Sequence, residues 1–342
     1  MLTSIDKMVP LSSEALGARP ERIVIGLVNN MPDPAIRATE RQFGGLLLAD
    51  GIEVALQYFH LPEVPRSENS RSVFLQSYAS IEQLWDSKLD GLIVTGAEPR
   101  APRLQDEPYW PTLTKVIDWA EENTISTIWS CLAAHAAVLH IDKLERRPLG
   151  SKLFGVFDCV KASEHPIVSG IPMRVPVPHS RLNALDRDEL VARDYQVITS
   201  SSLAGADMFL KQRKSLFVFF QGHLEYDSQT LLREYVRDAT RFINGERDTY
   251  PEMPHGYFDA AVVEEFERIR QEAIANPGPH ILAALAQSST GKSLMNTWRE
   301  PATNIYKNWL LHLAAEKNRR RSLDASSPAC VPSMERNVEG VS

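Results

Sequence analysis

From residue 22 onward, short apolar runs alternate with longer segments whose apolar positions recur at helical spacing. The run GLIVTG at 91–96 is apolar and closed by glycine, which is typical of a strand buried on both faces of a sheet. Strands are predicted at 22–29, 54–61, 91–96, 125–130, 195–201 and 215–223, and helices at 36–50, 80–88, 110–123 and 227–246, with another beginning at Cys131. This alternation predicts an α/β fold with a doubly wound, mostly parallel sheet.

The C-terminal part of the chain has a different pattern. Residues 259–287 predict one or two further helices, interrupted by the turn-forming NPGP at 276–279, and the segment after about residue 316 is polar and aperiodic. We therefore expect four parts, namely a flexible N-terminus (1–20), an α/β domain (21–258), a helical extension packed on that domain (259–315) and a disordered tail (316–342).

The composition of the chain argues against several classes of protein. The net charge of −7 argues against a general nucleic-acid surface, which needs a basic face. No apolar run approaches the roughly 20 residues of a membrane span, and the first twenty residues lack the pattern of a signal peptide. Three cysteines without paired spacing suggest no disulfide framework. We expect a cytoplasmic protein without membrane or nucleic-acid partners.

Cys131 stands where a predicted strand ends and a predicted helix begins. In a doubly wound sheet, ligands and catalytic groups gather at the carboxyl ends of the strands. Backbone N–H groups at a helix start can also stabilise a thiolate or an oxyanion. A cysteine packed as a small apolar residue fits the position equally well, so position alone leaves both interpretations open.

His223 and Glu225 follow the end of another predicted strand. Side chains at i and i+2 of an extended chain point to the same side, so the carboxylate can contact the imidazole and stabilise its charged form. Together with a cysteine at another strand end of the same sheet, the pair has the logic of a catalytic triad. A His-x-Glu pair alone is common on protein surfaces.

Six motifs occur in the order and spacing of a known family, namely GLIVTGA (91–97), YWP (109–111), WSCLAAHAA (129–137), KLFGV (152–156), PHSR (178–181) and GHLEYDSQTLLREYVRD (222–238). They make the chain similar to the homoserine O-succinyltransferase family. That family resembles class I glutamine amidotransferases, so the resemblance implies a glutamine amidotransferase-like, flavodoxin-like fold with extra C-terminal helices. It also implies acyl transfer from acyl-CoA to the hydroxyl of L-homoserine in methionine biosynthesis, with no cofactor beyond the acyl-CoA co-substrate, in a homodimer.

The resemblance also implies roles for individual residues. Cys131 matches the cysteine that becomes acylated, His223 the general base and Glu225 the acid that supports it. The matched substrate-binding positions are Lys152, Ser180 and Arg237. A seventh position selects the acyl donor in the family, where glycine accompanies succinyl and glutamate accompanies acetyl. This chain has Arg100 there, whose positive charge favours a dicarboxylic donor such as succinyl-CoA.

Other functions remain open at this stage. The chain could be a homoserine O-acetyltransferase or act on a related hydroxy amino acid. A glutamine amidotransferase-type hydrolase would use the same cysteine, histidine and glutamate, and a binding protein could keep the fold without turnover.

Two other motifs do not meet the requirements of the sites that they suggest. STGKS (289–293) lacks the first glycine of a phosphate loop, and Cys131 with His135 lacks the further ligands of a metal site.

Overall fold

The computed structural model describes residues 22–291 and 294–326. The predicted flexible segment at 1–20 therefore lies outside the described residues. The strands are β1 (Arg22–Val28), β2 (Glu53–Phe59), β3 (Gly91–Val94), β4 (Ser126–Ser130), β5 (Arg147–Lys161), β6 (Arg174–Ala184), β7 (Gln196–Val197), β8 (Thr199–Ser201), β9 (Gly205–Ala206), β10 (Met208–Gln212) and β11 (Leu216–Phe220). They form two sheets.

The larger sheet has seven strands in the order β2-β1-β3-β4-β11-β10-β7. The first five of these are parallel, β10 pairs antiparallel with β11, and β7 pairs antiparallel with β10. The parallel strands end in register, because Val28 pairs with Val94, Val94 with Trp129, and Ser130 with Phe220. The predicted mostly parallel sheet is confirmed, and its carboxyl ends lie side by side.

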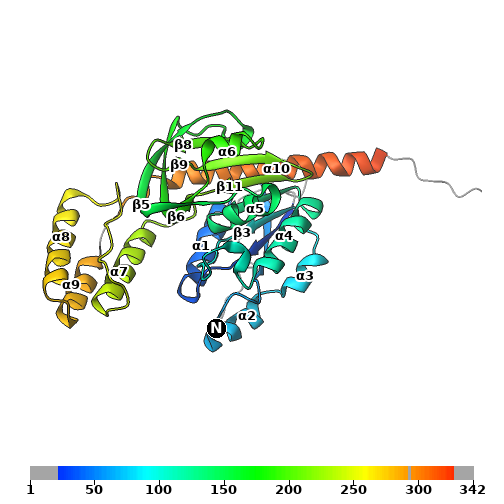
Figure 1. Cartoon of the computed structure of the whole chain (residues 1–342). Coiled ribbons are helices and arrows are strands. Elements are labelled where there is room, and N and C mark those ends of the chain that lie inside the picture. Colours follow the sequence, from blue (N-terminus) through cyan, green and yellow to red (C-terminus); the bar gives the residue numbers. More distant parts are fainter. Residues whose placement is uncertain (1–21, 292–293, 327–342) are drawn as a thin grey trace, which may run out of the picture.

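Helices cover both faces of this sheet (Figure 1). The helices of the described chain are α1 (Ile36–Leu46), α2 (Glu68–Ser77), α3 (Ile81–Trp85), α4 (Trp110–Asn123), α5 (Leu132–Asp142), α6 (Arg187–Val191), α7 (Thr230–Ile243), α8 (Ala260–Ala275), α9 (Pro279–Ser289) and α10 (Arg299–Ser326), with short 3-10 turns at Asp33–Ala35, Leu104–Asp106 and Pro166–Val168. Alternate residues of each central strand enter different apolar clusters. Ile93 and Ile128 pack with α1 and α10, whereas Val94 and Trp129 pack with α4 and α5. The sheet is therefore doubly wound, as predicted.

The smaller sheet, ordered β6-β5-β8-β9, was not predicted. Strands β5 and β6 are long, and they flank the larger sheet (Figure 1). The predicted strand at 195–201 is wrong as a single element. It divides into β7, which joins the larger sheet, and β8, which joins the smaller one.

The C-terminal helices differ in where they pack. The predicted break at 276–279 separates α8 from α9, and both lie beside α7, away from the central sheet (Figure 1). Helix α10 instead lies against the sheet, where the Trp309 Nε1–H donates to Ser126 Oγ at 2.8 Å.

Helix α10 also continues past residue 316, so the expected disordered tail is wrong for residues 316–326. Glu316 pairs with Arg319 at 2.6 Å and with Arg320 at 3.5 Å, and pairs three or four residues apart stabilise a polar helix. The remaining predicted tail, residues 327–342, lies outside the described residues.

Candidate active site

Cys131 occupies the sharp turn between β4 and α5. Its φ of 54° and ψ of −112° are unusual for a residue other than glycine. The Cys131 N–H donates to the Phe220 carbonyl at 2.7 Å, which ties the turn to the end of β11. Strained backbone of this kind is typical of a nucleophile held at a strand-to-helix junction.

The loop after β3 approaches this turn closely. A Cβ atom added at Gly96 would lie 2.9 Å from the Leu132 Cβ and 3.1 Å from its backbone nitrogen, so only glycine fits. Leu132 and Ala133 are the first residues of α5, where backbone N–H groups have no acceptor within the helix. These amides can receive negative charge that develops on an oxygen next to Cys131.

His223 and Glu225 lie directly after β11, and both side chains are buried. The His223 Nδ1 is 2.7 Å from Glu225 Oε1, and the imidazole stacks on Tyr226 with ring centroids 4.3 Å apart. Burial by itself lowers the pKa of His223. The charges of Cys131 and Glu225, with their hydrogen bonds to the ring, instead raise this pKa well above its ordinary value. The structure thus joins cysteine, imidazole and carboxylate in one charge-coupled chain.

A buried polar layer lies behind this chain, and no sequence motif predicted it. The Gly222 N–H, just before His223, donates to Asp207 Oδ1 at 3.0 Å. Asp207 also faces the buried His179, at 3.5 Å between Oδ1 and Nε2. Burial raises the pKa of Asp207 to about 6, because burial disfavours the charged carboxylate. Asp207 therefore positions the end of β11.

An acidic pair on α7 gathers the predicted substrate-binding residues. Glu234 Oε2 accepts from the Ser180 hydroxyl at 2.5 Å and lies 3.3 Å from Lys152 Nζ. Asp238 lies 3.2 Å from Lys152 Nζ and 2.8 Å from Arg237 Nη2. Burial by itself raises the pKa of Glu234, but the Lys152 charge and two hydroxyl donors hold it below its ordinary value. Both carboxylates are functional candidates that the sequence analysis missed.

One cavity of about 250 Å³ unites these groups. Its lining includes six of the seven predicted site residues, namely Cys131, His223, Glu225, Lys152, Ser180 and Arg237. Arg100 does not line it. Arg100 is exposed and borders a neighbouring hollow of about 200 Å³, which shares Ala97 and Glu98 with the cavity. The cavity is also lined by Arg146 and Arg181, which sequence reasoning did not single out.

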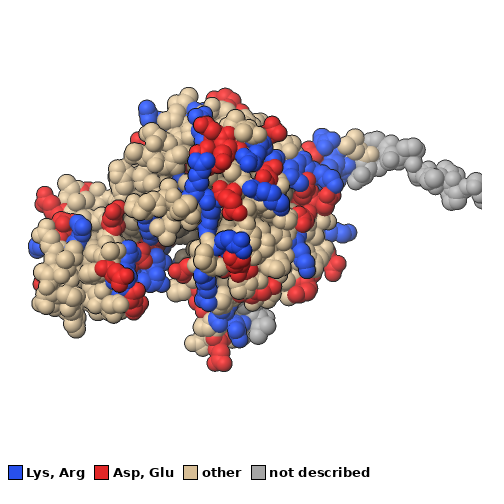
Figure 2. Space-filling view, viewed as in Figure 1, with Lys and Arg blue, Asp and Glu red and all other residues tan. Residues whose placement is uncertain are grey.

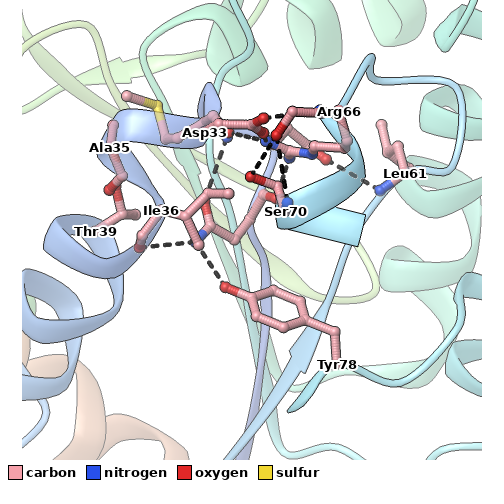
Figure 3. Close-up of polar contacts among 12 residues, drawn as sticks. Asp33, Ala35, Ile36, Thr39, Leu61, Arg66, Ser70 and Tyr78 are labelled. Atoms are coloured by element: carbon pink, nitrogen blue, oxygen red, sulfur yellow. Dashed lines mark hydrogen bonds and ion pairs between the residues drawn. The ribbon is translucent and has the colours of Figure 1, made fainter. Parts of the chain in front are cut away.

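The Met31–Pro32 wall of the cavity is held by a polar cluster at the end of β1 (Figure 3). Arg66, whose side chain is 4% exposed, donates to the carbonyls of Asn29 and Met31 and pairs with Asp33 at 3.3 Å. A guanidinium that spans two carbonyls and a carboxylate fixes the path of this loop.

His135 belongs to α5 and lines the cavity, and its side chain is hydrogen-bonded to another residue of the chain. Its Nε2 lies 2.9 Å from Gln221 Oε1, and burial lowers its pKa to about 3, so the ring is neutral. Among residues 22–291 and 294–326, no three His, Cys, Asp or Glu side chains are grouped as metal ligands would be. Residues 292 and 293 of the STGKS stretch lie outside the described part.

Comparisons with known proteins identify the family of the chain. A sequence model of the family described as homoserine O-succinyltransferase matches residues 2–319. A protein of Rhodopseudomonas palustris named homoserine O-succinyltransferase is 50% identical over 296 residues, which are 86% of this chain and 89% of the relative. One of the same name from Bradyrhizobium japonicum is 45% identical over 303 residues, 85% and 93% of the two chains.

A solved glutamine amidotransferase from Methylobacillus flagellatus is 15% identical with a TM-score of 0.47, covering 85% of this chain and 94% of that one. The family match spans nearly all of the described chain, and the two relatives align over most of their own length. The chain belongs to the homoserine O-succinyltransferase family.

Proposed function

We propose that this chain transfers the succinyl group of succinyl-CoA to the hydroxyl of L-homoserine, through an acyl intermediate on Cys131, as a step of methionine biosynthesis. Membership of the family supports the reaction. The observation that carries the mechanism is the chain of contacts that joins Cys131, His223 and Glu225 in one cavity.

The first half-reaction acylates the enzyme. The Cys131 thiolate attacks the thioester carbonyl of succinyl-CoA, and the carbonyl oxygen takes up negative charge beside the N-terminal amides of α5. The bond to the CoA sulfur then breaks. The imidazolium of His223 gives its proton to that sulfur, so CoA leaves as a thiol and Cys131 carries the succinyl group as a thioester.

The second half-reaction delivers the acyl group. Neutral His223 takes the proton of the homoserine hydroxyl, whose oxygen attacks the Cys131 thioester. The bond to sulfur breaks, and O-succinylhomoserine leaves. Thiolate and imidazolium are restored together, so no proton is gained or lost over the cycle.

The charges on α7 suit the amino-acid end of homoserine. Arg237 presents a guanidinium fork that can bind a carboxylate with two hydrogen bonds. Glu234, which lines the cavity, offers a carboxylate for an ammonium group, and Asp238 pairs with Lys152 and Arg237. In the absence of substrate these acidic and basic groups pair with one another, as the 3.3 Å and 2.8 Å contacts of the two carboxylates show. Homoserine would replace those pairs with its own two charges.

The experiment follows CoA release and product formation from succinyl-CoA and L-homoserine, with acetyl-CoA and L-glutamine in parallel reactions. Cys131→Ala should abolish transfer, and His223→Ala should lower it by about 10²–10⁴-fold. Cys159→Ala is the matched control, because this cysteine is fully buried away from the cavity. Ammonia release from glutamine without CoA release would contradict the proposal.

We also propose that the enzyme is a cytoplasmic homodimer that needs no cofactor besides its acyl-CoA co-substrate. Every helix within the described ranges is too short or too polar to cross a bilayer. Figure 2 shows acidic side chains between the basic ones on one face of the molecule, which together with the net charge of −7 supports the absence of a nucleic-acid partner. Light scattering of the purified protein tests the dimer.

A further inference from the structure

Four basic side chains line the cavity, and three of them already have hydrogen-bond partners. Lys152 and Arg237 both pair with Asp238, at 3.2 and 2.8 Å. Arg181 is buried and donates to an imidazole and to two backbone carbonyls. Arg146 makes no hydrogen bond and no ion pair with any residue that the structure describes. Of the four, it is the cation that has no ion pair to give up when a negatively charged substrate binds.

Arg146 lies in the short connection between α5 and β5, yet it acts on the opposite end of α5. Its charge is felt by His135 in the first turn of that helix, and the charge of Cys131 acts on Arg146 in return. The side chain is half-buried. Burial lowers the pKa of Arg146 below its ordinary value, because the loss of water outweighs the attraction of nearby acidic groups such as Glu107 and Glu145.

The space beside Arg146 contains other polar atoms without partners. The Tyr109 hydroxyl and Glu107 Oε2 are buried and have no hydrogen-bond partner in the described structure. Both residues line the neighbouring hollow that opens beside the cavity, and both act electrostatically on Arg146. Buried polar atoms are rarely left unpaired. The Tyr109 hydroxyl can donate to a carboxylate, whereas Glu107 Oε2 can only accept and calls for a donor.

We propose that Arg146 binds the distal carboxylate of the succinyl group, both in succinyl-CoA and in the acyl enzyme on Cys131. The inference rests on the proposed function and assigns the residue that distinguishes a dicarboxylic acyl donor from a neutral one. A succinyl group places its free carboxylate two methylenes from the carbonyl that Cys131 attacks. In a cavity of low dielectric constant that carboxylate needs a cation, and a guanidinium fork fits it with two parallel hydrogen bonds.

Arg100 is the competing candidate, and its surroundings suit the role less well. It is exposed and borders only the neighbouring hollow. Its backbone N–H is held by Glu107 Oε1 at 2.6 Å, so the loop is fixed while the side chain faces solvent-accessible space. An exposed charge pair contributes little to binding, whereas a desolvated one contributes more.

The test uses the full-length protein without homoserine and measures the second-order rate of CoA release, with the acyl enzyme identified by its mass. Succinyl-CoA is compared with butyryl-CoA, which has the same carbon chain with a methyl group in place of the carboxylate. The variants are Arg146→Gln and Arg146→Lys. Arg147→Gln is the matched control, since this adjacent arginine is exposed and pairs with Asp186 outside the cavity.

We expect Arg146→Gln to slow acylation by succinyl-CoA by about 10- to 100-fold, the range for loss of a charge-assisted hydrogen bond, and to leave acylation by butyryl-CoA unchanged. Arg146→Lys should lose less, and the Arg147 control nothing. The butyryl-CoA rate also reports whether the variant is folded.

Three results would overturn the inference. Equal losses with both donors would assign Arg146 to the CoA portion or to folding. An unchanged acylation rate, together with a raised KM for homoserine when the complete reaction is run with the same variant, would assign it to the acceptor. A donor ratio that responds to Arg100→Gln and not to Arg146→Gln would assign the role to Arg100. If the wild-type protein is not acylated by succinyl-CoA at all, the proposed function fails first and this inference with it.

Discussion

Replacing Glu225 by glutamine tests how His223 is kept charged. The change preserves an oxygen near Nδ1, which lies 2.7 Å from Oε1 in the wild-type protein, and removes the negative charge. At this distance and an effective dielectric constant of about 20, the Coulomb attraction to the imidazolium is roughly 6 kcal/mol. The net effect is smaller, because burying both charges costs solvation.

The energies of charged and neutral hydrogen bonds give the expected change in the pKa of His223. Hydrogen bonds to charged groups contribute about 1.5–3 kcal/mol and neutral ones about 0.5–1.5 kcal/mol. Glutamine at residue 225 should therefore remove roughly 1–2 kcal/mol of imidazolium stabilisation, which lowers the pKa of His223 by about one unit. The direction follows from the charge, since a negative neighbour favours the protonated ring.

The assay is the pH dependence of enzyme acylation by succinyl-CoA, followed as CoA release in single turnovers. Acylation needs the imidazolium to protonate the leaving sulfur, so the rate falls as pH rises through the pKa of His223. The alkaline limb should move down by about one pH unit in Glu225→Gln, and it should stay in place in Glu252→Gln, an exposed glutamate outside the cavity. An unmoved limb, or one displaced to higher pH, would refute the charge-stabilising role of Glu225.

Three further predictions concern the nucleophile, the buried layer and the fold. Incubation with succinyl-CoA alone should add one acyl mass to Cys131 and none to Cys159, because burial raises the pKa of the Cys159 thiol; peptide mapping decides. Burial raises the pKa of Asp207 in the folded protein from 3.8 to about 6. The free energy of unfolding of the wild-type protein should therefore fall by about 3 kcal/mol as the pH rises from about 4 to about 7. Denaturant unfolding at these two pH values should show no such fall in Asp207→Asn. Trp309→Phe removes the indole hydrogen bond to β4 and should cost about 1–3 kcal/mol of unfolding free energy; an unchanged thermal midpoint would contradict this.

The parallel sheet was predictable because its strands carry their own signal. Strands such as β3 and β11 are buried on both faces, so they are apolar at every position. The carboxyl ends of parallel strands meet at one edge, so the order of strands and helices along the chain places Cys131 and His223 at the same edge. That β4 and β11 are neighbours there is known only from the folded sheet.

The smaller sheet has no comparable signal. In β5 the buried and exposed positions do not alternate regularly, and its register with β6 shifts between Pro148 and Leu153. At Gly155 the chain has a φ of +137°, and a Cβ there would lie 2.3 Å from the backbone nitrogen of His255. This strand depends on a partner about a hundred residues further along the chain, which local pattern cannot reveal.

Among the site residues that the sequence analysis missed, some have a local sequence signal and others do not. Glu234 lies three residues before Arg237 on α7, and residues at that spacing share a helical face, so it could have been inferred. Asp207 and Arg146 have no such local relation to the site. Asp207 immediately precedes β10 and contacts the residue before His223, whereas Arg146 comes from a loop and lines the cavity, and only tertiary packing places either of them there.

In the proposed mechanism, the charge on Cys131 links the two half-reactions. While the thiolate is present, it raises the pKa of His223 above its ordinary value against the effect of burial, so the ring is an acid that can protonate CoA. Acylation converts the thiolate into an uncharged thioester. Burial then acts against the Glu225 charge alone, so the pKa of His223 falls and the ring becomes a base for the homoserine hydroxyl. Glu225 contacts the His223 Nδ1 both before and after acylation, so His223 can change from acid to base without moving. Acylation of Cys131 causes that change.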